Sequence, residues 1–139
     1  MNTSVITISR DEDIYEAMRM MALNNITGLP VVDDDGTLLG IITEKDVLVL
    51  LCNRLEEASM DREIGRVGDF MTRNVVCFDP EDRLSDIAEC LSTKDFRRVP
   101  ILDNGKLVGI ISRRDVLRHL RELRQQDEVL KDSILELLY

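Results

Sequence analysis

The stretch GIITEKDVL at Gly40–Leu48 occurs a second time as GIISRRDVL at Gly109–Leu117, 69 positions later (109 − 40). Each copy has a glycine, two isoleucines and a hydroxyl residue, followed by two polar residues, an aspartate and Val-Leu. A match of this detail over so short a stretch predicts an internal repeat.

The repeat continues upstream of this stretch. LPVVD at residues 29–33 matches VPILD at residues 99–103 with an offset of 70, which drops to 69 in the turn that follows. Turns tolerate such length changes. Four apolar residues in helical spacing recur at the same offset: Ile14, Ala17, Met18 and Met21 match Leu84, Ile87, Ala88 and Leu91. The chain is therefore two copies of one unit, at about residues 5–50 and 75–120.

Each copy predicts a short strand and then a helix. The first strand is expected at residues 4–8, and the helix after it is expected to start at the capping-box pattern Ser9–Glu12. In the second copy the helix start is placed at Asp79–Asp82, with a proline at the first helical position. The apolar stripe of each helix predicts its length, and the helices are expected to end at residues 24–25 and 94–95.

A β-hairpin and a second helix are expected next in each copy. DDG at residues 34–36 and NG at residues 104–105 are turn sequences between apolar strands. Thr43 and Ser112 then stand where a second helix begins, running from residue 44 past about 52 and from 113 to about 124. Both copies are therefore predicted to be α/β units of the form β-α-β-β-α.

The expected boundaries divide the chain into four parts. Unit 1 spans residues 1–58, a linker and lead-in spans 59–74, unit 2 spans 75–124, and a helical tail spans 125–139. The tail is rich in valine, leucine and isoleucine, so it is expected to pack on the domain, on another chain or on a neighbouring domain. Whether the chain is a fragment of a larger protein stays open.

Composition argues against several classes of protein. A length of 139 residues favours one module with a shared core. A net charge of −9 without a basic block argues against nucleic-acid binding. Cys52, Cys77 and Cys90 show no metal-ligand spacing, which indicates reduced thiols, a cytoplasmic location and no metal site. The sequence has no signal pattern and no apolar run long enough to cross a membrane.

Two such units in tandem resemble a CBS-domain pair, from the family named for cystathionine β-synthase. The resemblance rests on the Pro-containing strand start and the Gly-apolar-apolar-Thr/Ser-x-x-Asp ending of each unit, and it covers about residues 3–120. It implies an α/β module with pseudo-two-fold symmetry that binds adenosine-containing ligands in clefts between its units. It also implies dimerisation and the regulation of a partner protein or of an effector domain that this chain lacks.

The resemblance implies which residues line the clefts. Each cleft is expected to combine the Thr/Ser-x-x-Asp motif of one unit with the first strand and the Pro-containing strand start of the other. One cleft would contain Thr43 and Asp46 with Thr72, Val75, Val76, Arg97 and Arg98. The other would contain Ser112 and Asp115 with Ile6, Ile8, Thr27 and Gly28. The family's Met-Thr pair is present as Met71-Thr72 but only as Asn2-Thr3 before the first unit.

The repeated motif admits two roles. A hydroxyl group and free N–H groups at a helix start suit a phosphate, and a carboxylate one turn later can accept from both hydroxyls of a ribose. The patterns Thr43-x-x-Asp46 and Ser112-x-x-Asp115 are also ordinary helix caps. The two roles are compatible, and both stay open.

The two expected clefts differ in charge. Arg97 and Arg98 stand where the first copy has uncharged residues, and Lys45 lies within the first motif. An arginine pair suits a phosphate-bearing ligand, although the pair could instead balance nearby acids. Arg113 and Arg114 are interpreted as a solvated helix face, from which one could reach a phosphate.

Two functions from different classes follow. The first is regulatory sensing of AMP, ADP, ATP or an adenosyl relative, without a further cofactor. The alternative is a structural pair used for dimerisation or protein interaction, with no ligand. The sequence shows no nucleophile–base pair and no Gly-rich phosphate loop that would indicate an enzyme. The apolar faces of the helices predict a homodimer in either case.

Overall fold

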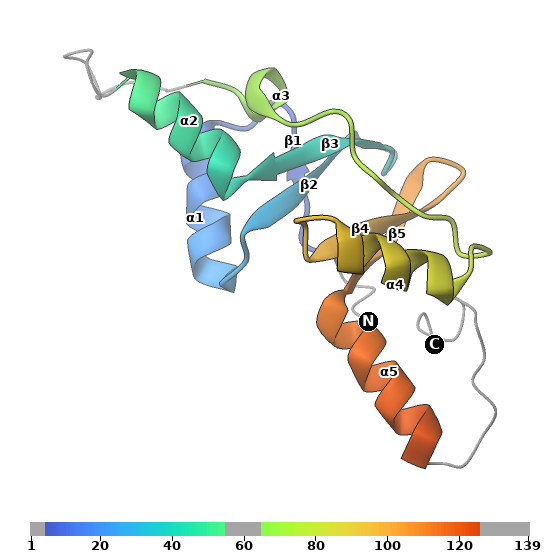
Figure 1. The fold of residues 1–139 in the computed structure, drawn as a ribbon. Coiled ribbons are helices and arrows are strands. Elements are labelled where there is room, and N and C mark those ends of the chain that lie inside the picture. Colours follow the sequence, from blue (N-terminus) through green and yellow to red (C-terminus); the bar gives the residue numbers. More distant parts are fainter. Residues whose placement is uncertain (1–4, 55–64, 126–139) are drawn as a thin grey trace. The chain divides into compact units, whose positions relative to one another are not determined.

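The computed structural model describes residues 5–54 and 65–125 (Figure 1). The chain forms two compact units, of which one is Ile6–Val75 and the other contains the described residues from Val76 to Gln125. The first unit has the predicted β-α-β-β-α order, and the second has it with a single-residue bridge at Phe78 in place of the first strand, which confirms the expected α/β fold class. None of the described helices is long and apolar enough to cross a membrane.

The first unit is a three-stranded sheet with two principal helices. β1 runs parallel to β2, and β2 runs antiparallel to β3, in the order β1-β2-β3. The apolar positions predicted for the first helix are buried among the strands, so one hydrophobic core joins all these elements. The elements are β1(Ile8–Ser9), α1(Ile14–Asn24), β2(Gly28–Val32), β3(Leu38–Thr43), α2(Glu44–Arg54) and α3(Val67–Phe70).

The second unit repeats this plan with a shorter first strand. Phe78 alone pairs with Ile101 in parallel, in the place that β1 holds in the first unit. Backbone bonds from Phe78 N to Pro100 O (3.1 Å) and from Leu102 N to Phe78 O (2.8 Å) hold it there. The other elements are α4(Leu84–Thr93), β4(Arg98–Asp103), β5(Lys106–Ser112) and α5(Arg113–Gln125).

Both hairpin turns form where the sequence predicts them. Asn104 (φ 52°) and Gly105 (φ 80°) make the two-residue turn between β4 and β5, in the left-handed region that Asn-Gly favours. Three residues separate Asp33 from Thr37 in the first turn, against two between the equivalent Asp103 and Lys106. Asp33 Oδ1 stabilises the longer turn by accepting from Asp35 N (3.2 Å) and Thr37 N (2.9 Å). This difference explains the drop in repeat offset from 70 to 69.

The predicted start of the first helix was wrong. The Ser9 side chain accepts from Asp11 N (3.3 Å) and closes a local turn, whereas α1 begins at Ile14. Asp13 is the N-cap, and its carboxylate accepts from Tyr15 N (3.1 Å). The strand expected at residues 4–8 is also displaced, because β-pairing is confined to Ile8–Ser9 within the described residues.

The predicted start of the equivalent helix in the second unit was wrong for a similar reason. Asp79 and Asp82 bind each other in a turn, with Asp79 N donating to Asp82 Oδ2 (2.7 Å) and Asp82 N donating to Asp79 O (2.9 Å). α4 begins only at Leu84, after Arg83, which provides no side-chain cap. An aspartate can close a turn as readily as it can cap a helix, and here it closes the turn.

The two units end their first helices differently. Asn25, in the left-handed conformation (φ 51°, ψ 48°), terminates α1, as the sequence predicts. At the end of α4, Lys94 is extended, and the Arg113 guanidinium donates to the carbonyl oxygens of Leu91 (2.9 Å), Lys94 (2.9 Å) and Phe96 (3.3 Å). Arg113 is exposed, as predicted, but it also has a structural role that the sequence did not indicate, because its guanidinium satisfies carbonyls at and just beyond the end of α4.

We expect Arg113→Ala to destabilise the protein by roughly 1–2 kcal/mol, because three carbonyl oxygens lose a charged donor. Thermal unfolding should show a Tm lower by several degrees. Arg114→Ala is the matched control, since the neighbouring arginine is exposed and makes none of these contacts among the described residues. Equal losses of Tm for the two variants would contradict this capping role.

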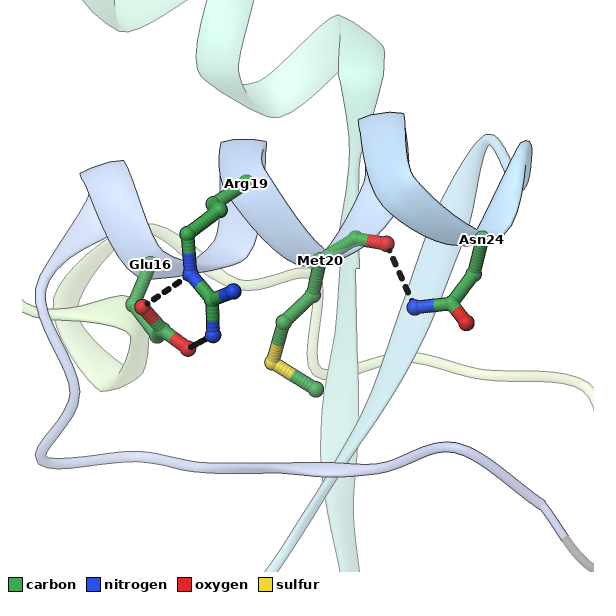
Figure 2. Close-up of polar contacts among 4 residues, drawn as sticks. All are labelled: Glu16, Arg19, Met20 and Asn24. Carbon is green, nitrogen blue, oxygen red and sulfur yellow. Dashed lines mark hydrogen bonds and ion pairs between the residues drawn. The ribbon is translucent and has the colours of Figure 1, made fainter.

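The outer face of α1 carries a short ion pair (Figure 2). Arg19 Nε donates to Glu16 Oε2 (2.9 Å), and Asn24 Nδ2 donates to the Met20 carbonyl (2.8 Å). The hydrogen bonds from Arg19 lower the pKa of the Glu16 carboxyl group. Arg19 is exposed and Glu16 is half-buried at the surface, so solvent screens this pair and it contributes little to stability.

Candidate functional site

The first copy of the repeated motif lies at the junction of β3 and α2. Asp46 Oδ2 accepts from Thr43 N (3.0 Å) and from Thr43 Oγ1 (3.0 Å). Asp46 N in turn donates to Thr43 Oγ1 (3.2 Å). The two residues therefore cap each other and join the end of β3 to the first turn of α2, in the manner of a capping box.

The second copy has the same geometry at the junction of β5 and α5. Asp115 Oδ2 accepts from Ser112 N (2.8 Å) and Ser112 Oγ (2.9 Å), while Asp115 N donates to Ser112 Oγ (3.1 Å). The structure thus confirms the capping role of both motifs. It also fixes each carboxylate, half-buried, at a helix N-terminus, where backbone dipoles favour an anion.

Thr72 joins the first motif from a distant part of the sequence. Its hydroxyl donates to the Asp46 carboxylate, at 3.1 Å from Oδ1 and 3.2 Å from Oδ2. Its backbone is fixed on β3, because Ile41 N donates to Thr72 O (2.9 Å) and Thr72 N donates to Ile41 O (2.8 Å). The structure therefore brings together Thr43, Asp46 and Thr72, three of the predicted site residues.

Gly40 makes this arrangement possible, although sequence reasoning did not select it. A Cβ atom at this position would lie 2.5 Å from the Thr72 carbonyl oxygen and 3.0 Å from Met71 Sδ. Only a residue without a side chain lets residues 71–72 approach β3 so closely. The signal was available, since a glycine heads both copies of the repeated stretch.

The second motif has a different neighbour. Arg118 Nη1 lies 3.9 Å from Asp115 Oδ1, one turn along α5. The equivalent position on α2 is Val49, so the first motif has no such cation. Thr3, which the family's Met-Thr pair sets against Thr72, lies outside the described residues. The two carboxylates therefore differ in surroundings, with a neutral hydroxyl at Asp46 and a guanidinium near Asp115.

The strand starts lie beside the motif of their own unit. Gly28 pairs with Thr43 across β2 and β3, and Arg98 pairs with Ser112 across β4 and β5. Arg113 N donates to Arg97 O (3.0 Å) in the same region. The assignment of Arg97 and Arg98 to the Asp46 motif stays a prediction.

The remaining predicted residues vary in exposure. Ile8 is buried in the first core and Ile6 is half-buried against it. Thr27 is exposed, Val75 is half-buried and Val76 is exposed. Within the described part of the chain, no group of three or more histidine, cysteine, aspartate or glutamate residues could hold a metal ion.

Comparison with known proteins gives the family. The family model described as CBS domain matches residues 1–53 and 67–122. Protein MJ1225 of Methanocaldococcus jannaschii is 35% identical over 120 residues, an alignment that covers 86% of this chain and 41% of that protein. The chain thus spans less than half of that relative. The crystal structure of MJ1225 matches with a TM-score of 0.78 over 86% of this chain and 45% of that one.

Two similar structures contain adenosine compounds. CBSX2 of Arabidopsis thaliana was crystallised with AMP, and it matches with a TM-score of 0.74 and 31% identity over 87% of this chain and 90% of that one. The CBS domain pair of protein MJ0100 was crystallised with 5′-methylthioadenosine and S-adenosyl-L-methionine. It matches with a TM-score of 0.68 and 28% identity over 86% of this chain and 93% of that one. The internal repeat, the fold and the family-model match all give the same assignment. The chain belongs to the CBS-domain family as a tandem pair of CBS domains.

Proposed function

We propose that this chain is a regulatory module that senses an adenine nucleotide. The observation that carries the proposal is the cluster of Thr43, Asp46 and Thr72, which sets a carboxylate and two hydroxyls at the N-terminus of α2. The AMP and S-adenosyl-L-methionine in the structures of similar CBS pairs support an adenosine-type ligand. The ligand is AMP, ADP, ATP or an adenosyl relative.

Asp46 is the proposed ribose acceptor. A carboxylate has about four acceptor positions, and its bonds to Thr43 and Thr72 leave part of this capacity for a ligand. A ribose diol would share the carboxylate with Thr72, or replace the hydroxyl of Thr72 by rotation of that side chain. Asp115 offers the equivalent carboxylate in the second motif.

We assign phosphate recognition to three cationic side chains. Arg97 and Arg98 are both exposed, and a guanidinium pair binds phosphate oxygens through charged hydrogen bonds. Lys45 adds a cation in the first turn of α2. We assign these three residues to the ligand of the Asp46 motif, which makes it the preferred site for a phosphate-bearing nucleotide.

A thermal-shift series tests the proposal. A ligand that binds only the folded state at 100 times its Kd adds roughly 2.7 kcal/mol, so millimolar AMP or ATP should raise the Tm by several degrees. Guanosine and cytidine nucleotides should raise it less. Equal shifts for all bases would indicate a phosphate site without adenosine specificity, and no shift at all would favour the structural alternative.

A second proposal is a homodimer formed through the helices. Leu48 (60% exposed), Val49 (54%) and Leu117 (66%) place large apolar side chains on the surfaces of α2 and α5. Exposed apolar side chains that form a contiguous patch mark interaction surfaces, and we propose that these residues belong to such patches. Light scattering is expected to give twice the chain mass of 15.9 kDa. A monomer at every accessible concentration would refute the dimer.

A further inference from the structure

Arg113 is tied to the chain segment that leads into the two arginines proposed to bind phosphate. Its guanidinium donates to the carbonyl oxygens of Leu91 (2.9 Å), Lys94 (2.9 Å) and Phe96 (3.3 Å). Its backbone N–H donates to the carbonyl oxygen of Arg97 (3.0 Å). One residue at the start of α5 therefore holds the backbone from the last turn of α4 to the residue before β4.

The first unit holds the equivalent segment in a different way. Its backbone repeats one of these bonds, because Glu44 N donates to Thr27 O (3.0 Å). The carbonyl that corresponds to that of Leu91 belongs to Met21, and it accepts from the backbone N–H of Ile26 (3.0 Å). An ionised Glu44 side chain only accepts hydrogen bonds, so it cannot bind carbonyl oxygens. Within the described residues, the side-chain clamp is therefore a feature of the second unit.

The clamp fixes the backbone from which Arg97 and Arg98 project. Arg98 is the first residue of β4 and pairs with Ser112 of β5, whereas Arg97 precedes the strand and is held by its bond from Arg113. Both arginines are exposed. Fixing the backbone in advance lowers the conformational entropy that the segment loses when its side chains bind an anion.

Arg113 also satisfies acceptors that would otherwise compete for the neighbouring arginines. Carbonyl oxygens at the C-terminal end of a helix lack partners within the helix and attract cationic groups. The carbonyl oxygens of Lys94 and Phe96 already accept from a charged donor, the Arg113 guanidinium. The side chains of Arg97 and Arg98 therefore have less reason to turn back onto their own segment.

We infer that Arg113 is a positioning residue for phosphate recognition. It sets the backbone of Arg97 and Arg98 for the phosphate of the nucleotide, and its own guanidinium stays on the carbonyl oxygens of residues 91, 94 and 96. The inference rests on the proposed nucleotide-sensing function. It adds a residue that determines the preference for a phosphate-bearing ligand without contacting that ligand.

Titration calorimetry with AMP and adenosine tests this role, because the two ligands differ only in the phosphate. Arg113→Met keeps an unbranched side chain and removes the guanidinium. We expect it to weaken AMP binding about tenfold and adenosine binding less than about twofold. A general loss of structure would weaken both ligands alike, and circular dichroism at the titration temperature establishes that the variant is folded. An unchanged ratio of AMP to adenosine affinity would overturn the inference.

Two further variants control for charge and for the shape of the donor. Arg121→Met removes the same charge from an exposed position further along α5 and is expected to leave both affinities unchanged. Arg113→Lys keeps the charge but donates from one nitrogen, whereas the guanidinium reaches its carbonyl oxygens through Nε and Nη2. We expect Arg113→Lys to lose about threefold in AMP affinity, between the parent and Arg113→Met. A loss for Arg121→Met equal to that for Arg113→Met would show a nonspecific charge effect and refute the positioning role.

A double-mutant cycle separates positioning from direct contact with the phosphate. In a background of Arg97→Ala and Arg98→Ala, Arg113→Met is expected to cause little further loss of AMP affinity, because the side chains that it positions are absent. A further loss of about tenfold in this background would show that Arg113 binds the phosphate itself, which would overturn the inference. Absence of AMP binding by the unmodified chain would refute the proposed function together with this inference. Saturable AMP binding with an unchanged ratio for Arg113→Met would refute the inference alone.

Discussion

Gly40→Ala is expected to destabilise the first unit strongly, because the added methyl group would collide with the backbone of a neighbouring segment. The new Cβ atom would lie 2.5 Å from the Thr72 carbonyl oxygen and 3.0 Å from Met71 Sδ. A carbonyl oxygen held in a backbone pair cannot rotate away as a flexible side chain can. The chain at residues 71–72 must shift instead, which disrupts both backbone bonds between Ile41 and Thr72.

The expected loss is about 1–3 kcal/mol from overpacking, which corresponds to a decrease in Tm on the order of 5–10 °C. Gly28→Ala is the matched control, because a Cβ atom there would meet its neighbours at 3.5 to 3.6 Å, an ordinary contact distance. Differential scanning calorimetry of the two variants makes the comparison. Similar values of Tm for both would show that the close approach at Gly40 does not determine stability.

Asp46→Asn is expected to weaken adenine-nucleotide binding tenfold to a hundredfold, or by about 1.4–3 kcal/mol. The asparagine carbonyl can still accept from Thr43, and its amide can donate to the Thr72 hydroxyl, so the cap at the start of α2 is retained. What is lost is the negative charge that accepts the ribose hydroxyls. A drop in nucleotide affinity with little change in Tm would show that the Asp46 carboxylate acts in binding rather than in folding.

Two matched variants locate the main site. Asp115→Asn is expected to change nucleotide affinity little, because we assign the tighter site, with its phosphate-binding cations, to the Asp46 motif. Arg98→Ala should weaken ATP or ADP more than adenosine, since it removes a phosphate contact and leaves the ribose acceptor in place. If Asp115→Asn abolishes binding while Asp46→Asn binds like the parent, the assignment of the main site is reversed.

The sequence predicted the features that depend on local spacing. The β-α-β-β-α order, the two hairpins and the mutual capping of Thr43 with Asp46 all follow from residues a few positions apart, and the repeat makes each of these signals occur twice. The helix starts failed because Ser9 and Asp79 could form either a turn or a cap, and the sequence alone does not rank these alternatives.

Contacts between distant positions were not predictable from one sequence. Thr72 was selected through the family resemblance, but its hydrogen bond to Asp46 spans 26 positions. The bond from Arg113 to the Leu91 carbonyl spans 22 positions. The role of Gly40 depends on the same tertiary approach of residues 71–72. These contacts depend on the tertiary structure, in which the strands bring distant segments of the chain together.

Isothermal titration calorimetry with AMP and GMP tests the proposed nucleotide sensing most directly. The two ligands share ribose and phosphate, so the comparison isolates recognition of the adenine base. We predict saturable binding of AMP to the unmodified chain, with GMP binding at least tenfold more weakly. The absence of saturable AMP binding up to millimolar concentration, or an equal affinity for GMP, would contradict the role as an adenine-nucleotide sensor.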